Sequence, residues 1–427
     1  MKHIKHISFF ILFIVFTINI NTAFAQPRNQ HANQQLRFVD ECEAFNLSSK
    51  CRPNPPPKPA RTNFIKDEVV LLYSSKNQNE AKAVTKKYQL KPKTKTTLGS
   101  VNLGMIVADT NGKNPLQLAS KISKAEKNVD AATNNTYQPA AVAKDKVLNS
   151  APKNAYSMVE TGVQLVHKST KGKGVLICMI DTPVDIFHPT FSNTHIETLD
   201  LIKFDPKDIE TQTHGTSVAG VLISQNKHIG IAPEAKLYAI SAFNTTTNRP
   251  HVLQGSSSNV ALALDRCIRH KADVINLSFT GGKDALVERM VQKAISKGII
   301  VVAAGGNGGH WGSTVYPALI PGVLAATAVD ENKHLYSKAN KGRFIDYSAP
   351  GVNVLTIAPK GKYTISSGTS LSAAHVTGII ALLLSKQKSN QVEQVLTQTA
   401  LDLGKPGRDQ EFGEGLISAN RALSHLK

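Results

Sequence analysis

The C-terminal two thirds of this 427-residue chain predict an α/β fold built on a mainly parallel sheet. Short, unbroken apolar runs, typical of buried strands, alternate there with longer segments whose apolar residues recur at helical spacing. Such alternation is typical of strand–helix–strand units, whose strands lie parallel in one sheet. The region is also long enough to bury a large core within a single domain.

The expected strands and helices follow in chain order. The expected strands are 175–180, 236–241, 274–277, 299–304 and 323–328. The expected helices are 260–268, 286–297 and 372–384. Because functional sites gather at the carboxyl ends of parallel strands, the polar residues that follow a strand are site candidates. Asp181 follows the first expected strand, and Asn307 follows the fourth.

Ser370 lies where a loop becomes an apolar helix, within the segment 367–376. A Gly-Thr step before it permits a tight turn, and the apolar residues after it predict a buried helix. Backbone N–H groups at a helix start, together with the helix dipole, favour a developing oxyanion. The alternative for this segment alone is an ordinary Ser/Thr helix cap.

Two upstream residues supply a base and a group to orient it. Asp181 ends an apolar strand, and His214 is expected to open a helix whose Gly and Ala residues permit close packing. Taken singly, the aspartate is an ordinary turn residue and the histidine an ordinary surface residue. Together with Ser370, they form the set of groups that activates a serine nucleophile.

The three segments resemble the active-site segments of subtilisin-like serine proteases, the subtilases, in the same chain order. The segments are Asp181-Thr182, His214-Gly215-Thr216 and Gly368-Thr369-Ser370. The resemblance extends over about 270 residues and includes 230–235, 273–278, 303–307, 316–318, 348–351 and 413–419. It implies a subtilisin-like three-layer fold and a serine endopeptidase that hydrolyses peptide bonds through an acyl-enzyme.

The resemblance also implies a role for each group. Ser370 Oγ would attack the peptide carbonyl while His214 takes and later returns the proton, and Asp181 would orient the imidazole. The oxyanion hole would consist of the Asn307 side-chain amide and the backbone N–H of Ser370.

A substrate-binding edge is implied as well. Ser278, Phe279, Thr280 and Gly281 would pair with the substrate backbone, and Gly305 and Gly306 would allow close backbone approach. Thr280 stands where the family often has Gly, so we expect its branched side chain to narrow the neighbouring pockets. The alternatives are a core strand end without substrate contact and, for the glycine-rich loop, a flexible turn.

Pro183 is the main departure from the family pattern, which normally has Gly at this position. Proline removes a backbone N–H close to Asp181 and fixes φ. The alternative function is therefore a catalytically weakened protease-like binding protein, or a highly selective processing factor.

The N-terminus predicts export. Lys2 and Lys5 precede an apolar run over 7–18, and Ala23-Phe24-Ala25 has the form of a signal-peptide cleavage site. We therefore expect a signal peptide at 1–25, a secreted or periplasmic protein, and no membrane span after cleavage. A retained membrane anchor is the alternative.

Four further segments follow the signal peptide. Residues 26–62 are rich in proline and hold Cys42 and Cys51. Residues 63–129 alternate strand and helix patterns, and their position resembles a subtilase pro-domain that inhibits its own protease. Residues 130–153 are expected to form an exposed processing linker before the catalytic domain, 154–427. A binding domain retained in the mature protein is the alternative for 63–129.

Cysteine usage agrees with export. Cys42 and Cys51 are expected to form a local disulfide, whereas Cys178 and Cys267 are expected to be buried free thiols. No metal motif is present, so no cofactor is required, although structural calcium remains open because subtilases often bind it at less regular sites.

The basic charge lies mostly outside the expected catalytic domain. The chain carries a net charge of +19. Residues 26–150 hold 20 Lys and Arg against 10 Asp and Glu, and residues 151–427 hold 28 against 21. Much of the excess would leave with the pro-region, which argues against nucleic-acid binding. We expect a monomer acting on polypeptide substrates.

Overall fold

The computed structural model describes residues 63–140, 146–152, 155–246, 249–309, 315–387 and 391–426. All of them belong to one structural unit, Pro57–Lys427. The expected signal peptide, 1–25, and the proline-rich segment, 26–62, lie outside the described residues. The expected disulfide between Cys42 and Cys51 therefore stays a prediction.

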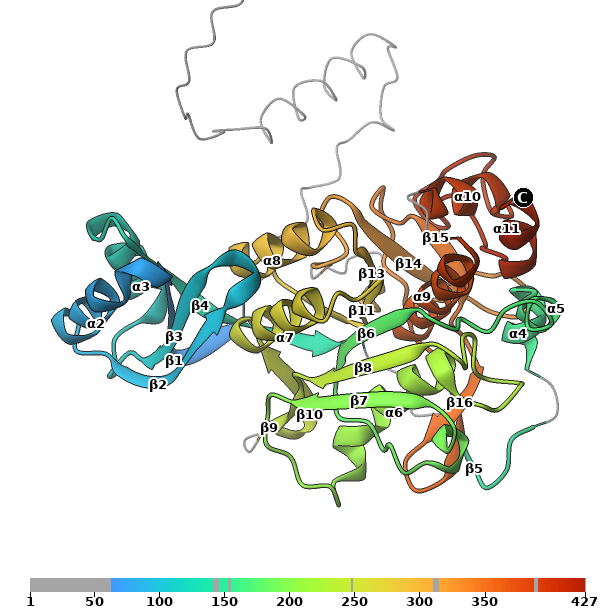
Figure 1. Cartoon of the computed structure of the whole chain (residues 1–427), viewed down its shortest axis with the longest axis horizontal. Helices are drawn as coiled ribbons and strands as arrows, with labels where there is room; N and C mark the ends of the chain where they lie inside the picture. Colours follow the sequence, from blue (N-terminus) through green and yellow to red (C-terminus); the bar gives the residue numbers. More distant parts are fainter. Residues whose placement is uncertain are drawn as a thin grey trace, which may run out of the picture. The chain divides into compact units, whose positions relative to one another are not determined.

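A seven-stranded sheet lies at the centre of the C-terminal region (Figure 1), in the order β15-β14-β13-β11-β6-β8-β7. Every neighbouring pair is parallel. Its strands are β6 (Leu176–Asp181), β7 (His195–Asp200), β8 (Lys236–Ser241), β11 (Val274–Leu277), β13 (Ile300–Ala304), β14 (Val323–Val329) and β15 (Tyr347–Pro350). The expected parallel α/β sheet is confirmed. β7 was not predicted because this edge strand has no continuous apolar run and is largely exposed.

Helices cover both faces of this sheet. On β6, Ile177 and Met179 belong to the core shared with α6 (Ile209–Ile223) and α9 (Thr369–Lys386). Cys178 and Ile180 belong to the core shared with α7 (Ser257–Arg269) and α8 (Ala285–Ile295). Because successive strand side chains point to opposite faces, the two helix pairs lie on opposite sides of the sheet. The expected three-layer fold is confirmed.

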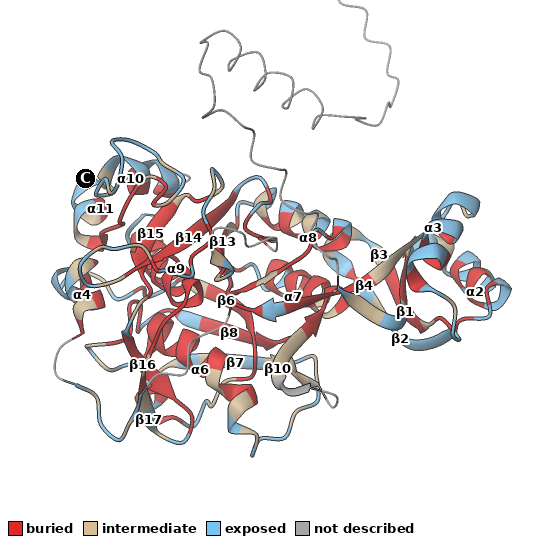
Figure 2. Cartoon of the chain, turned by 180° about the vertical axis from the view of Figure 1, so that it is seen from behind, coloured by how far each residue is buried: buried red, intermediate tan, exposed pale blue. Residues whose placement is uncertain are grey.

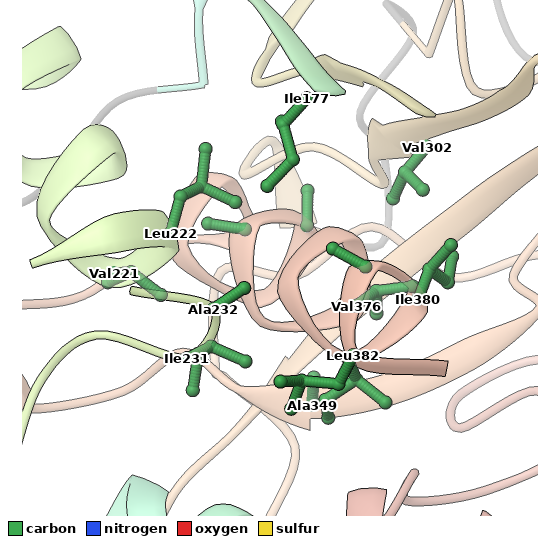
Figure 3. Close-up of a cluster of buried hydrophobic side chains, with 14 of the residues drawn as sticks. Ile177, Val221, Leu222, Ile231, Ala232, Val302, Ala349, Val376, Ile380 and Leu382 are labelled. Atoms are coloured by element: carbon green, nitrogen blue, oxygen red, sulfur yellow. The ribbon is translucent and has the colours of Figure 1, made fainter. Parts of the chain in front are cut away.

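Helix α9 is the central element of its layer. Figure 3 shows its side chains Val376, Ile380 and Leu382 within a cluster that includes Ile177 and Val302 of the sheet. Among the described helices, only α9 is long and apolar enough to cross a membrane, and 89% of its apolar window is buried inside the protein. Such burial is typical of a core helix.

The N-terminal described residues form an antiparallel sheet with two helices and a core of its own. Its strands are β1 (Phe64–Ser74), β2 (Lys91–Leu98), β3 (Leu103–Asp109) and β4 (Val129–Pro139), in the order β2-β3-β1-β4. Its helices are α2 (Gln78–Lys87) and α3 (Pro115–Ala125). The outer surfaces of both helices are exposed (Figure 2). β2 was not predicted because it is a run of Lys and Thr without apolar alternation.

The prediction of an exposed linker over 130–153 was wrong for its first part, which forms strand β4. The polar residues Asn134, Asn135 and Thr136 suggested a loop, but each is at most 8% exposed. They are buried because their polar groups have partners in the protein: Asn134 Oδ1, for example, accepts from the Ser258 N–H at the start of α7.

The smaller elements connect these layers. They are η1 (Ser75–Asn77), η2 (Gly99–Val101), β5 (Val147–Leu148), α4 (Tyr156–Glu160), α5 (Val163–Val166), η3 (Pro189–Phe191), β9 (Asn244–Thr246), β10 (Arg249–Ser256), β12 (Phe279–Gly281), β16 (Val354–Ala358), β17 (Lys362–Ser366), α10 (Val392–Thr399) and α11 (Ala419–His425).

Cys178 and Cys267 form a disulfide, so the prediction of two free thiols was wrong. Their Cα atoms lie 5.7 Å apart although 89 residues separate them in the sequence. The bond joins β6 to α7. Each residue looked like an ordinary buried cysteine because the contact exists only once α7 packs on the sheet.

Candidate active site

The structure brings Asp181, His214 and Ser370 together in one hydrogen-bonded line. Asp181 Oδ1 lies 2.6 Å from His214 Nδ1, and His214 Nε2 lies 3.0 Å from Ser370 Oγ. All three residues are buried, with exposed fractions of 4% or less. A hydroxyl, an imidazole and a carboxylate in this order can activate the hydroxyl as a nucleophile.

Asp181 and Ser370 lie where the sequence placed them. Asp181 is the last residue of β6, and Ser370 is the second residue of α9, directly after the turn at Gly368 and Thr369. His214 differs from the expectation. It lies in the middle of α6 rather than at its start, because the Asp208 side chain, six residues earlier, caps the helix by accepting the Thr211 N–H.

The loop after Asp181 keeps its contacts despite Pro183. The Thr182 N–H donates to Asp181 Oδ1 at 2.6 Å, and Thr182 Oγ1 accepts the Gly215 N–H at 2.8 Å. These bonds connect the aspartate loop to the helix that carries His214. The second carboxylate oxygen, Asp181 Oδ2, is buried without a hydrogen-bond partner among the described residues. Proline at position 183 offers it no N–H.

Asn307 lies in the glycine-rich loop after β13 and is held by the residue that precedes Ser370. Its Oδ1 accepts from the Thr369 backbone N–H at 3.1 Å and from Thr369 Oγ1 at 2.9 Å. The Gly306 N–H donates to the same Thr369 hydroxyl at 3.1 Å. With the amide oxygen bound to Thr369, Nδ2 is the donor edge of the side chain.

The expected substrate-binding edge is occupied by the chain's own strand β4. β12 pairs antiparallel with β4, with Phe279 opposite Pro139, Thr280 opposite Gln138 and Gly281 opposite Tyr137. β10 pairs with β4 on its other side at Thr136 and Tyr137. The strand is therefore held as a peptide is held in β-augmentation.

Ala140, which follows β4, reaches the candidate active site. Its N–H donates to the Ser278 carbonyl at 3.0 Å. Its carbonyl oxygen accepts from Ser370 Oγ at 2.6 Å and lies 3.3 Å from His214 Nε2. The sequence held no signal for this contact, since 130–153 looked like a linker.

Tyr137 is one of the two most buried residues of this strand, at 1% exposed. Its ring meets Phe279 edge to face at 5.6 Å between centroids, and a Cβ at Gly281 would overlap it. Its hydroxyl donates to the Gly282 carbonyl at 3.2 Å. Burial raises the pKa of Tyr137 well above its usual value, so the hydroxyl stays a donor.

A buried polar chain behind the nucleophile was missed by sequence reasoning. Ser278 Oγ donates to the Ser370 carbonyl at 3.1 Å and accepts from Asn276 Nδ2 at 2.8 Å. Asn276 Oδ1 in turn accepts from Thr377 of α9 at 3.0 Å. These bonds fix the start of α9 against Ser278, which lies between β11 and β12 and whose carbonyl accepts the Ala140 N–H.

No group of three or more His, Cys, Asp or Glu side chains within the described ranges is arranged to hold a metal ion. That the protein requires no cofactor stays a prediction.

Comparison with known proteins places these residues in a family. The sequence model of the subtilase family matches residues 172–415, more than half of the chain. The thermostable alkaline protease of Halalkalibacterium halodurans is 36% identical over 259 residues, which cover 59% of this chain and 68% of that protein. Subtilisin E of Bacillus subtilis is 35% identical over 262 residues, which cover 59% of this chain and 66% of that protein.

A solved structure agrees with the fold. Fervidolysin from Fervidobacterium pennivorans, described as a keratinolytic enzyme related to subtilisin, has a TM-score of 0.73 with this chain at 21% identity. The likeness covers 87% of this chain and 64% of that one. Asp181, His214, Asn307 and Ser370 all lie inside the family match. This chain therefore belongs to the subtilase family and is a serine endopeptidase.

Proposed function

We propose that this chain is an exported subtilase made as a zymogen, which cleaves its own peptide bond between Ala140 and Ala141. The Asp181–His214–Ser370 triad would carry out this cleavage and the later hydrolysis of polypeptide substrates. The observation that carries the proposal is the Ala140 carbonyl, which lies within hydrogen-bond distance of Ser370 Oγ and at the end of a strand bound like a substrate.

The reaction follows from the groups around that carbonyl. Ser370 Oγ attacks the Ala140 carbonyl carbon as His214 Nε2 takes the hydroxyl proton. When the C–N bond breaks, His214 returns the proton to the departing Ala141 amine, leaving Ala140 as an ester on Ser370. Water then attacks the ester by the same route. Asp181 holds the imidazole in the required tautomer through Nδ1.

Charge on the carbonyl oxygen needs donors during the attack. The Asn307 amide and the Ser370 backbone N–H would supply them, at the N-terminal end of α9 where the helix dipole also favours negative charge. In subtilisin, a relative of this chain, loss of the equivalent side-chain donor costs roughly 3 kcal/mol.

The pro-region would inhibit the enzyme by staying in place after cleavage. Its strand β4 occupies the substrate edge, and its η2 turn contacts α7, where Asp265 Oδ1 accepts the Ser100 N–H at 2.7 Å. Asp265 is fully buried beneath this contact. Since these contacts do not depend on the Ala140–Ala141 bond, a cleaved pro-region can remain bound as a product-like inhibitor.

The bound strand suggests which substrates fit. The buried Tyr137 ring, three residues before Ala140, supports a preference for an aromatic residue at that position. The Thr280 methyl group lies close to the Gly306 backbone, since a Cβ added at Gly306 would be 3.4 Å from it. This crowding supports a preference for small residues, such as Ala140, at the cleaved bond. Indistinguishable cleavage profiles for the wild type and Thr280→Gly would overturn the second preference.

Export rests on the N-terminal sequence and on the disulfide. The predicted signal peptide lies outside the described residues. The Cys178–Cys267 bond supports an oxidising compartment, since stable structural disulfides are rare in the reducing cytosol.

The experiment is to express the full chain with and without Ser370→Ala in a host that lacks other proteases. We expect the wild type to be trimmed and to bind a fluorophosphonate probe at Ser370. We expect Ser370→Ala to accumulate with its pro-region attached and to remain unlabelled.

Ser372→Ala is the matched control, because it removes a hydroxyl from the same helix at a residue bound to Ala349. It should mature and bind the probe. Normal maturation of Ser370→Ala would overturn self-processing, and a wild type without label would overturn the triad.

A further inference from the structure

We propose that Asn340 is a positioning residue, which clamps the backbone on both sides of Asn307 and thereby fixes the oxyanion donor. The inference rests on the proposed function, because it assigns Asn340 a part in the same reaction. Asn340 lies between β14 and β15, more than 30 residues from Asn307 in the sequence, and is 3% exposed.

Two hydrogen bonds make the clamp. The Asn340 backbone N–H donates to the Gly306 carbonyl at 3.0 Å, and its side-chain Oδ1 accepts the Gly308 N–H at 2.8 Å. Gly306 and Gly308 are the residues immediately before and after Asn307. One residue therefore sets the path of the chain into and out of the candidate donor.

The side chain of Asn340 also packs directly on the loop. Gly306 has a φ of +98°, and a Cβ there would overlap Asn340 Nδ2. Glycine is thus required at position 306, and Asn340 fills the space that its missing side chain leaves. The Gly309 N–H, directly after Gly308, donates to the Lys338 carbonyl at 2.8 Å. This bond connects the loop to the segment that carries Asn340.

The clamp complements the bonds from Thr369, which hold the Asn307 amide oxygen. Thr369 sets how the amide is turned, whereas Asn340 sets where the backbone beneath it lies. Preorganised donors lose their effect with small displacements, and an error of about 1 Å can cost roughly 100-fold in rate. The hydrogen bonds of Asn340 within the described residues go to the loop and not to the reacting atoms.

The test measures kcat and KM of Asn340→Ala on a peptide amide, with the active-site concentration fixed by fluorophosphonate titration. We expect kcat to fall about tenfold to 100-fold while KM changes less than about twofold, because oxyanion stabilisation is realised only in the transition state. The matched control is Asn332→Ala, an exposed asparagine nearby, which should leave both constants unchanged.

A double-mutant cycle separates positioning from a general structural role. In an Asn307→Ala background the donor is gone, so Asn340→Ala should cost less than about twofold in kcat. An equal loss in both backgrounds, a loss confined to KM, or no loss would overturn the assignment.

If Asn340→Ala does not fold, Asn340→Ser is measured in the same cycle with the same criteria. Like alanine, serine keeps the backbone bond to Gly306, and it leaves a polar group in the buried site. A wild type without activity would overturn the proposed function and this assignment with it. An active wild type with an additive cycle overturns the role of Asn340 alone.

Discussion

The two helix layers of the seven-stranded sheet differ in what they hold. The α6–α9 layer carries His214 and Ser370, whose buried side chains bond to each other, and His214 also bonds to Asp181. The α7–α8 layer contacts the N-terminal segment, for example where Asp265 Oδ1 accepts the Ser100 N–H. Strand β6 serves both layers, since Cys178 and Asp181 point to opposite faces. The catalytic residues and the Asp265 contact therefore lie on opposite faces of the sheet but are joined by one strand.

The disulfide gives the largest expected effect on stability. The double variant Cys178→Ala/Cys267→Ala frees a loop of 89 residues, for which chain entropy predicts a loss of about 4.6 kcal/mol in the free energy of unfolding. The measurement is urea unfolding in a Ser370→Ala background, which prevents autolysis. The folded fraction of the otherwise wild-type enzyme should retain its kcat, because the bond lies on the α7–α8 face of the sheet, opposite the catalytic residues. A loss below about 1 kcal/mol would contradict this account.

His375 of α9, in the layer that carries the catalytic residues, should make the free energy of unfolding fall in acid. Burial lowers the pKa of His375 to about 4 from 6.5, so the unfolded chain binds a proton in this range that the folded chain does not. The contribution of His375 to the free energy of unfolding is fully present above pH 6.5. It is lost as the pH drops toward 4, by about 3 kcal/mol in total. His375→Gln should remove this part of the slope in urea unfolding across that range.

The exposed His334, whose side chain is 77% exposed, provides the control. His334→Gln should leave the slope unchanged. An unchanged slope for His375→Gln would show that His375 does not contribute to the acid sensitivity.

Asp265 tests the contact between η2 and α7. Asp265→Ala removes a charged acceptor from the Ser100 N–H, and hydrogen bonds to charged groups contribute about 2 kcal/mol. We expect the cleaved pro-region to bind roughly thirtyfold more weakly, seen as earlier onset of peptidase activity after processing. Asp265→Asn keeps a neutral acceptor, so its affinity for the cleaved pro-region should lie between those of the wild type and Asp265→Ala.

Glu411→Gln is the control for charge, because it changes a partly exposed carboxylate that pairs with Lys341 elsewhere on the surface. The kcat of the fully released enzyme should be the same in all variants. A lower kcat for released Asp265→Ala would mean that the two layers are not separate.

Pro183→Gly gives the smallest expected effect. An N–H two residues after an aspartate is a common donor to its carboxylate, and Asp181 Oδ2 is buried without a partner among the described residues. Glycine would restore such a donor, so we expect kcat to rise by no more than a few fold. A fall in kcat would show that the fixed φ of proline matters more than the missing N–H.

The sequence was most informative where residue chemistry and chain order coincide. Asp181, Ser370 and Asn307 each follow a strong local pattern, and five strands of the central sheet were visible as apolar runs. The resemblance to subtilases supplied their roles. The helix position of His214 was less well predicted because the cap at Asp208 lies outside the motif.

Features that depend on distant contacts were not predictable. The disulfide, the partners of Asn134 and the clamp of Asn340 each join segments far apart in the sequence. Strand β4 looked like a linker because its polar residues are buried through partners far away in the sequence, among them Ser258 of α7 and Glu68 of β1. Local composition predicts that such polar residues are exposed, but tertiary contacts bury them.

Self-processing is tested most directly by finding which peptide bond of the chain Ser370 cuts first. The decisive measurement is N-terminal sequencing of the first intermediate that wild-type protein forms from the Ser370-dependent reaction, collected at early times. The account predicts Ala141 as the first residue, because the Ala140 carbonyl lies 2.6 Å from Ser370 Oγ. A Ser370-dependent first cut at any other bond would contradict it.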